Sequence, residues 1–197
     1  MISWQDQSSN AYVLSQDTIL ERPTLLSSGL NDLPSLEFYG AQFLNGGDIL
    51  DIYTNSRSMF CVGAMTEPSG DSFFTKSESA AVPDRYGILR PGNGHTRFQY
   101  VDLANHDINT GFFAGPNDNA LYFASSDRSS AENKFFINNT LIGSSIFNAL
   151  YSINSDQRFL IGALSEVGDA TERHYLDGTL SEILFVDMVD SCYNFCR

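Results

Sequence analysis

The architecture of this 197-residue chain is most evident from one segment near its end, His174-Tyr175-Leu176-Asp177-Gly178-Thr179-Leu180-Ser181-Glu182-Ile183-Leu184-Phe185-Val186-Asp187. The Asp-Gly pair predicts a tight turn, because glycine readily takes the positive φ that such turns need. The residues after it favour a strand with apolar side chains on both faces: Leu180, Leu184 and Val186 on one, Ile183 and Phe185 on the other. We therefore predict a turn followed by a strand that is central in a sheet and buried on both sides.

Short segments with strand patterns recur upstream at regular spacing, separated by turn residues. The predicted strands are residues 35–39, 49–53, 58–65, 72–76, 86–90, 95–101, 120–124, 134–137, 140–142 and 158–162. Asn138-Asn139 predicts a two-residue hairpin, and residues 146–151 a helical turn. This pattern is typical of an all-β fold, an antiparallel β-sandwich of two sheets, in one domain over residues 1–197 with residues 188–197 as a short tail.

Composition excludes several classes of partner. The net charge is −13 and the sequence pI is about 4.3, so phosphate backbones and anionic lipid surfaces are repelled. We expect no nucleic acid and no membrane insertion, because no run approaches the roughly 18 apolar residues of a membrane span. The first residues lack the basic start and apolar core of a signal peptide. Solubility is the simplest role of the negative charge.

The three cysteines do not form a disulfide framework of the secreted type. Cys61 lies inside an apolar run, which predicts a buried free thiol. Cys192 and Cys196 lie four residues apart near the end of the chain. They could pair with each other, pair between two chains, or stay reduced.

Six segments of the sequence resemble a known family. Residues 4–10, Trp-Gln-Asp-Gln-Ser-Ser-Asn, residues 22–25 and residues 28–40 are similar to the opening of laminin-G-like jelly rolls in the concanavalin A-like superfamily. Residues 136–143, 159–162 and 175–187 are similar to the last three strands of the same family. The resemblance implies a two-sheet jelly roll. It also implies extracellular adhesion, glycan recognition or a place on a virion surface.

Two departures from the family concern the ends of the chain. Family members usually carry a further strand before the tryptophan segment, and their last strand usually continues into a helix. A missing strand would be supplied by a neighbour or a longer parent chain, or its edge would stay open. Both departures therefore indicate assembly with neighbouring chains, and a homo-oligomer is one candidate. The resemblance implies a virion or extracellular surface, although the first residues lack a signal peptide. A phage structural protein that is released by lysis would account for both observations. A fragment of a larger secreted protein would account for them equally well.

Catalytic patterns are weak in this sequence. A glucanase of this fold would place two or three carboxylates at alternate positions of one strand. Glu37 instead has Ser35 and Tyr39 two residues away, and Glu182 lies between leucines. His106 beside Asp107, or His95, could join a serine in a triad, but no nucleophile motif is present. We predict that the chain is not an enzyme.

Candidate ligand sites lie in polar loops. Asn117, Asp118, Asn119 and Tyr122 are predicted to bind a glycan, and Tyr39, Tyr53 and Tyr100 are further rings on which a sugar could stack. Calcium is a candidate cofactor, with oxygens from Asp48, Asp51 and Asp118. The sequon at Asn138 is explained by the hairpin.

These observations lead to three ranked hypotheses. The first is a non-enzymatic, glycan-directed binding or adhesion module on a virion or cell surface. The second is a purely structural subunit, such as a capsid decoration or fibre protein, whose partner is a neighbouring structural protein. The third is a glycan-degrading enzyme of the same fold.

Overall fold

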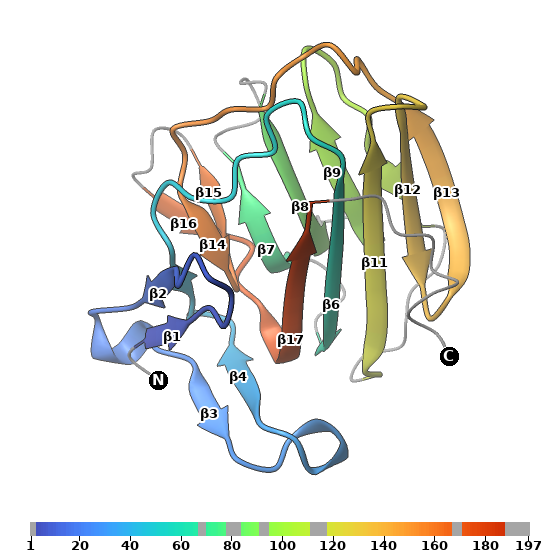
Figure 1. The fold of residues 1–197 in the computed structure, drawn as a ribbon. Coiled ribbons are helices and arrows are strands. Elements are labelled where there is room, and N and C mark those ends of the chain that lie inside the picture. Colours follow the sequence, from blue (N-terminus) through green and yellow to red (C-terminus); the bar gives the residue numbers. More distant parts are fainter. Residues whose placement is uncertain are drawn as a thin grey trace.

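The computed structural model describes residues 3–66, 70–77, 84–90, 95–110, 118–166 and 171–187. The fold is all-β and consists of two large antiparallel sheets, as predicted (Figure 1). Apart from two 3-10 turns, Ile19–Glu21 and Leu30–Asp32, the described residues form strands and loops. Within these residues, no helix is long and apolar enough to cross a bilayer.

The order of the strands across each sheet, from one edge to the other, differs from their order in the chain. The eight-stranded sheet contains β1 (Ser3–Gln5), β2 (Val13–Ser15), β5 (Leu44–Asn45), β14 (Phe159–Ile161), β7 (Asp71–Lys76), β8 (Arg85–Arg90), β9 (Arg97–Val101) and β10 (Ile108–Asn109). The seven-stranded sheet contains β13 (Thr140–Ile146), β12 (Glu132–Ile137), β11 (Ala120–Asp127), β6 (Arg57–Met65), β17 (Asp177–Val186), β4 (Ser35–Tyr39) and β3 (Thr24–Leu26). A separate hairpin pairs β15 (Leu164–Glu166) with β16 (Thr171–Arg173).

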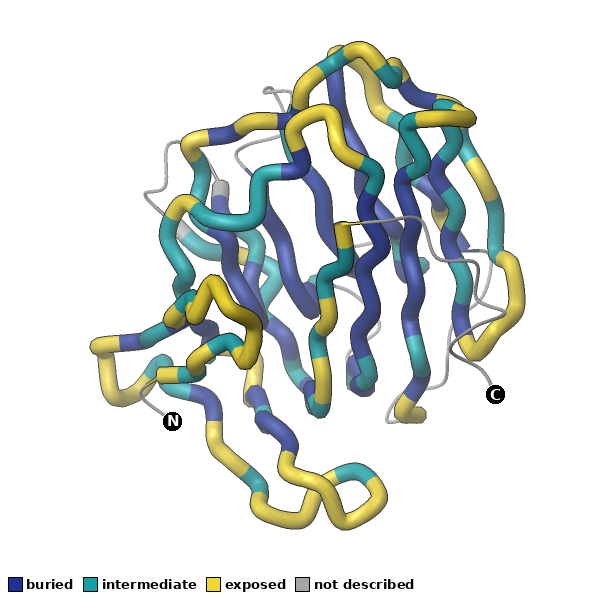
Figure 2. Tube along the Cα trace, in the orientation of Figure 1, coloured by how far each residue is buried: buried dark blue, intermediate teal, exposed yellow. Residues whose placement is uncertain are grey.

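Aromatic rings fill the space between the sheets. Among the central strands, β6, β7 and β8 are almost wholly buried, whereas the loop between β3 and β4 is mostly exposed (Figure 2). Burial of such rings is the main favourable contribution to folding, at about 25 cal/mol per Å² of apolar surface. Cys61 lies in this core as a free thiol, as predicted, and burial raises its pKa well above the ordinary value.

The segment that led the sequence prediction forms β17, which lies between β6 and β4 as a central strand. Three details of the prediction were wrong: the turn, the alternation of the faces, and burial on both sides, since Glu182 and Leu184 are exposed. Asp177 and Gly178 are not a turn, because they already pair with Tyr39 and Phe38 of β4. A bulge after Leu180 inserts an extra residue and reverses the alternation. Leu180 therefore shares the core face with Ile183 and Phe185, and Leu184 points outward, 38% exposed.

Among the other predicted elements, one hairpin is confirmed, whereas one strand and one helical turn are wrong. The Asn138-Asn139 hairpin is confirmed, with φ of 47° and 66°. Residues 49–53 form a loop rather than a strand, and Leu50 and Tyr53 have positive φ. Residues 146–151 are not helical, since β13 continues to Ile146 and a turn follows. Asn117, Cys192 and Cys196 lie outside the described residues.

Candidate functional site

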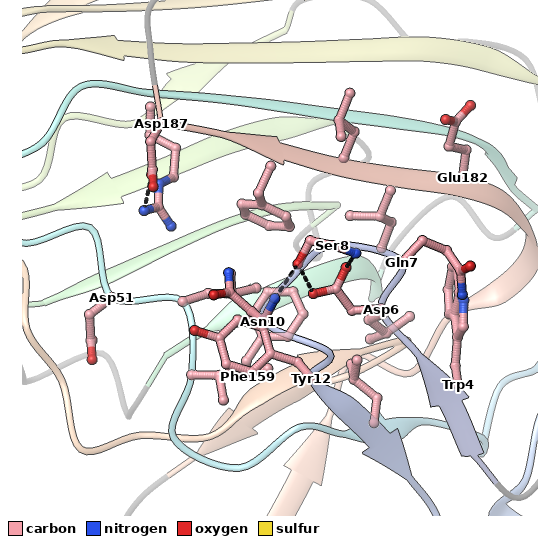
Figure 3. Close-up of a pocket in the computed structure, with 18 of the residues that line it drawn as sticks. Trp4, Asp6, Gln7, Ser8, Asn10, Tyr12, Asp51, Phe159, Glu182 and Asp187 are labelled. Atoms are coloured by element: carbon pink, nitrogen blue, oxygen red, sulfur yellow. Dashed lines mark hydrogen bonds and ion pairs between the residues drawn. The ribbon is translucent and has the colours of Figure 1, made fainter.

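A cleft of about 900 Å³ lies beside the C-terminal half of β17 (Figure 3). Its walls come from three parts of the chain: the β1–β2 hairpin, the loop at residues 48–55, and β17 from Ser181 to Phe185 with Asp187. The rings of Trp4, Tyr12 and Tyr53 contribute to the lining, together with polar side chains. The cleft thus combines aromatic and hydrogen-bonding groups on one surface.

The first wall is shaped by hydrogen bonds inside the β1–β2 hairpin. Trp4 pairs with Leu14, and the backbone N–H of Asp6 donates to the Tyr12 carbonyl at 2.8 Å. The Ser8 N–H donates to Asp6 Oδ1 at 2.7 Å, and the Ser8 hydroxyl donates to the other carboxylate oxygen. These hydrogen bonds lower the pKa of Asp6, and the bond from the Ser8 hydroxyl has the largest effect. Asp6 is therefore a fixed negative charge at the cleft.

The second wall is held by a buried lysine. The Lys76 side chain is fully buried, and its Nζ lies 2.6 Å from Asp48 Oδ1 and 3.0 Å from Asp51 Oδ1. Nζ also donates to the Ile49 carbonyl at 2.8 Å. The oxygens of Asp48 and Asp51 that were predicted to bind calcium instead contact an ammonium group, whose single positive charge offsets one of their two negative charges. Across the described part of the chain, no group of three or more His, Cys, Asp or Glu side chains could hold a metal.

The third wall is an open sheet edge. β17 pairs with β6 along Gly178–Val186, but β4 pairs only with residues 177–180. Beyond Leu180, no strand among the described residues adjoins β17 on the β4 side. Arg57 of β6 forms an ion pair with Asp187 at one end of this edge. Main-chain donors and acceptors of β17 are thus left at the cleft.

The structure does not bring the sequence-predicted glycan residues together at this cleft. Asp118 and Asn119 are exposed near the start of β11, where Asn119 Oδ1 accepts a hydrogen bond from Thr179 at 3.3 Å. Tyr122 is a correction: it has 0% exposure, and its ring centroid lies 4.9 Å from that of Phe73. A ring inside the core cannot stack on a sugar at the surface.

Among the other tyrosines, the structure distinguishes surface rings from core rings. Tyr53 is 50% exposed and lines the cleft, Tyr39 is 59% exposed elsewhere, and Tyr100 is buried. Sequence reasoning did not propose Trp4 or Tyr12. Their signal was available, since both are aromatic residues in an otherwise polar N-terminal segment, although Trp4 also packs against the core.

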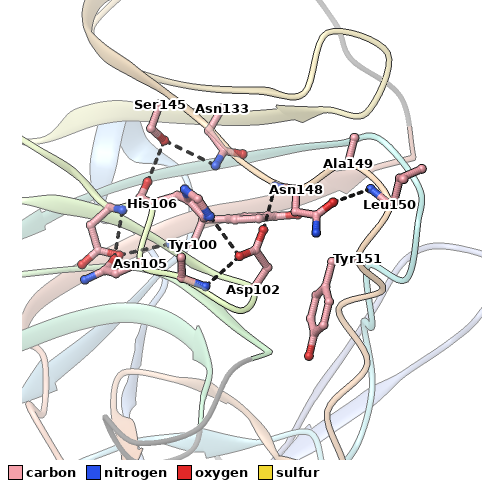
Figure 4. Close-up of polar contacts among 12 residues, drawn as sticks. Tyr100, Asp102, Asn105, His106, Asn133, Ser145, Asn148, Ala149, Leu150 and Tyr151 are labelled. Atoms are coloured by element: carbon pink, nitrogen blue, oxygen red, sulfur yellow. Dashed lines mark hydrogen bonds and ion pairs between the residues drawn. The ribbon is translucent and has the colours of Figure 1, made fainter.

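The predicted histidine constellation has a different geometry from a triad (Figure 4). His106 Nε2 lies 2.9 Å from Asp102 Oδ1, whereas Asp107 pairs with Arg97 at 2.7 Å. The Ser145 hydroxyl donates to the His106 backbone carbonyl at 2.7 Å, so it does not face the imidazole. Asp102 Oδ2 also accepts the Asn148 N–H at 2.8 Å. These contacts join two loops and give no nucleophile next to a base.

We expect Asp102→Asn to lower the free energy of unfolding by about 1–3 kcal/mol at pH 7. Burial raises the pKa of Asp102, but hydrogen bonds from the Ala104 and Asn148 N–H groups and from His106 outweigh it, and the pKa falls below its ordinary 3.8. A lowered folded-state pKa stabilises the fold above pH 3.8 and loses that contribution as pH falls through the folded value. Urea denaturation of both proteins at several pH values checks this, and a constant difference down to pH 2 would contradict it.

The comparisons with known proteins support the fold. The sequence matches no family model and no curated protein. Solved structures do resemble it: the binding domain of Paraclostridial Mosquitocidal Protein 1 (TM-score 0.69, 11% identity, 95% of this chain) and Domain 4 of AbnA, a GH43 extracellular arabinanase from Geobacillus stearothermophilus, in complex with arabinotriose (0.63, 12%, 86%). The Ruminococcus gnavus IT-sialidase CBM40 is a third (0.60, 11%, 81%).

This chain covers very different shares of the chains that it resembles. This chain covers 94% of the CBM40 chain and 77% of the AbnA domain, but 47% of the mosquitocidal-protein chain. It spans about a quarter (26%) of a NanB chain that it also resembles. At these identities, the likeness establishes a β-sandwich fold shared with carbohydrate-binding domains.

Proposed function

We propose that this chain is a non-enzymatic carbohydrate-binding module that holds a glycan in the cleft beside β17. The observation that carries the proposal is the lining of that cleft, where Trp4, Tyr12 and Tyr53 alternate with amide, hydroxyl and carboxylate side chains. Aromatic faces stack on the apolar faces of sugar rings, while polar groups bind hydroxyls. Fold neighbours that are carbohydrate-binding domains, one of them bound to sialyllactose, add support.

The contacts of the carboxylates favour binding over hydrolysis. A glycosidase needs a protonated carboxylic acid and a second free carboxylate across the scissile bond. In this cleft Asp48 and Asp51 contact Lys76, and Asp187 contacts Arg57. The pKa of Asp6 is lowered, which is opposite to the shift that a general acid needs.

We further propose kinship with laminin-G-like domains and a place on a virion or extracellular surface. The resemblance of residues 4–10 and 175–187 to that family is the support for both.

Binding can be followed through Trp4, because it is the single tryptophan of the chain. We expect the tryptophan fluorescence to change in a saturable way when an oligosaccharide that binds the chain is added in increasing amounts. Tyr53→Ala should weaken binding roughly tenfold, the effect of about 1.4 kcal/mol of lost stacking. The matched control is Tyr39→Ala, because Tyr39 is similarly exposed but does not line the cleft. Equal affinity of the two variants would contradict the assignment of the cleft.

A structural subunit is the second candidate function. The open edge of β17 favours it, because unpaired strand edges accept an extended segment from a neighbouring chain. Light scattering with and without reductant distinguishes the two candidates. A defined oligomer together with no glycan binding would favour the structural subunit, and a monomer that binds glycans would contradict it.

A further inference from the structure

We infer that the cleft selects uncharged glycans and rejects glycans that carry a carboxylate, such as sialylated or uronic-acid chains. This inference rests on the proposed function and names the substrate class of the same site. It departs from the fold neighbour that was solved bound to α2,3 sialyllactose. It follows from the charges of the residues that line the cleft, from the ion pairs that these residues already form, and from the open strand edge of β17.

The ionisable side chains of the lining are mostly acidic. They comprise five carboxylates and a single guanidinium: Asp6, Asp48, Asp51, Glu182 and Asp187, with Arg57. The carboxylates come from all three walls, so a ligand anywhere in the cleft lies near at least one of them. The whole chain, at a net charge of −13, adds to the same potential.

The two cations of the region are already engaged. Arg57 pairs with Asp187, and Lys76 is fully buried beneath Asp48 and Asp51. An arriving carboxylate would compete with Asp187 for Arg57 and with Asp48 and Asp51 for Lys76. A site for sialic acid would instead offer a cation to the ligand, and recognition of carboxylates typically uses bidentate arginine.

Two carboxylates of the lining are not paired with a described cation: Asp6 on the β1–β2 hairpin, and Glu182 on β17, which projects from the side of that strand facing away from Asp6 (Figure 3). Asp6 accepts hydrogen bonds from Ser8, which hold it as an anion. Glu182 is exposed on β17 and makes no ion pair with a described residue. A ligand carboxylate in the cleft would therefore lie near the negative charge of Asp6, and Glu182 adds negative charge at the rim formed by β17.

The open edge of β17 supplies what an uncharged ligand needs. A sugar hydroxyl both donates and accepts, so it can bind either the N–H or the C=O groups that β17 leaves unpaired after Leu180. Asp6 and Glu182 add acceptors for hydroxyl protons. Affinity for a neutral glycan therefore does not require a cation, and the same acceptors disfavour an anion.

The first experiment is a glycan array that carries equal numbers of neutral and carboxylated oligosaccharides, probed with the intact chain. We expect most of the bound glycans to be neutral. A majority of carboxylated glycans would overturn the inference while leaving the proposed function intact. No bound glycan of either kind would instead mean that the proposed function fails.

The second experiment isolates charge from shape. The tightest neutral glycan is compared with its derivative that has one primary alcohol oxidised to a carboxylate, and with the methyl ester of that derivative. We expect the carboxylate form to bind roughly tenfold more weakly than the ester at 0.01 M salt, where the screening length is about 30 Å. The gap should narrow at 0.15 M salt, where that length is about 8 Å. A gap that does not change with salt would contradict an electrostatic origin.

A matched pair of variants assigns the effect to Glu182. Glu182→Gln should narrow the ratio of ester to carboxylate affinity roughly threefold, because glutamine keeps an acceptor oxygen but removes the negative charge. Asp118→Asn removes the same charge from an exposed position outside the cleft lining and should leave the gap unchanged. Equal effects of the two variants would mean that net charge, not the cleft, controls selection, and would overturn the inference.

Discussion

Replacing Lys76 with methionine should lower the free energy of unfolding by about 3–5 kcal/mol, because removal of one partner leaves buried charge unpaired. Lys76 is fully buried, and Asp51 beneath the cleft wall is only 10% exposed in its side chain. Methionine fills a similar volume, so the loss comes from charge and not from a cavity. Urea denaturation at pH 7 measures the difference.

The matched control is Lys134→Met, which removes a lysine from a surface pair. Lys134 Nζ lies 3.0 Å from Glu132, and its side chain is 44% exposed. Surface pairs contribute about 0–1 kcal/mol, so this variant should lose little stability. Adding Asp51→Asn to Lys76→Met should restore part of the loss, since it removes one unpaired charge. Similar losses in the two lysine variants would contradict the importance of the buried position.

Gly178→Ala should destabilise the fold by about 3 kcal/mol or more, because overpacking against backbone cannot relax by side-chain rotation. A Cβ on Gly178 would lie 2.0 Å from the Ala64 carbonyl oxygen, and its φ is 154°. The collision would separate β17 from β6 at the centre of the seven-stranded sheet. The measurement is again urea denaturation, with soluble yield as a second readout if the variant fails to fold.

Gly47→Ala is the control for Gly178→Ala. Gly47 has a φ of 70°, but a Cβ there would meet no atom within 4 Å. This variant should lose only the conformational cost of a positive φ, about 1 kcal/mol. If both variants lost the same amount, the collision with Ala64 would not be the cause.

Local sequence patterns predicted most of the strands, since strand residues alternate or run apolar over a few positions. The hairpin at Asn138-Asn139 followed from the left-handed φ that asparagine tolerates. The bulge after Leu180 could not be predicted, because it depends on how β17 meets Val62 and Gly63 on another strand. The one extra residue of this bulge was enough to assign Leu180 to the wrong face of the strand.

The candidate site was predicted far less well than the fold. Its walls are distant in sequence, as the pairing of Asp48 with Lys76 and the approach of Trp4 to β17 illustrate. Asp48 and Asp51 were identified as oxygen ligands of a cation, and the cation is a lysine. No local pattern reports which charge lies opposite a carboxylate, so partner identity needed the three-dimensional arrangement.

The place of β17 in the sheet has a consequence for biosynthesis. Its partners β6 and β4 are complete by Met65, yet β17 begins at Asp177. At about 5–20 residues per second, a ribosome needs roughly 5–20 s to make the intervening chain. During that interval β6 and β4 lack their shared neighbour, and such edges are prone to aggregation. We therefore expect the yield of native protein to depend on translation speed and chaperone supply, because β17 closes the middle of the sheet and is made after the other described strands.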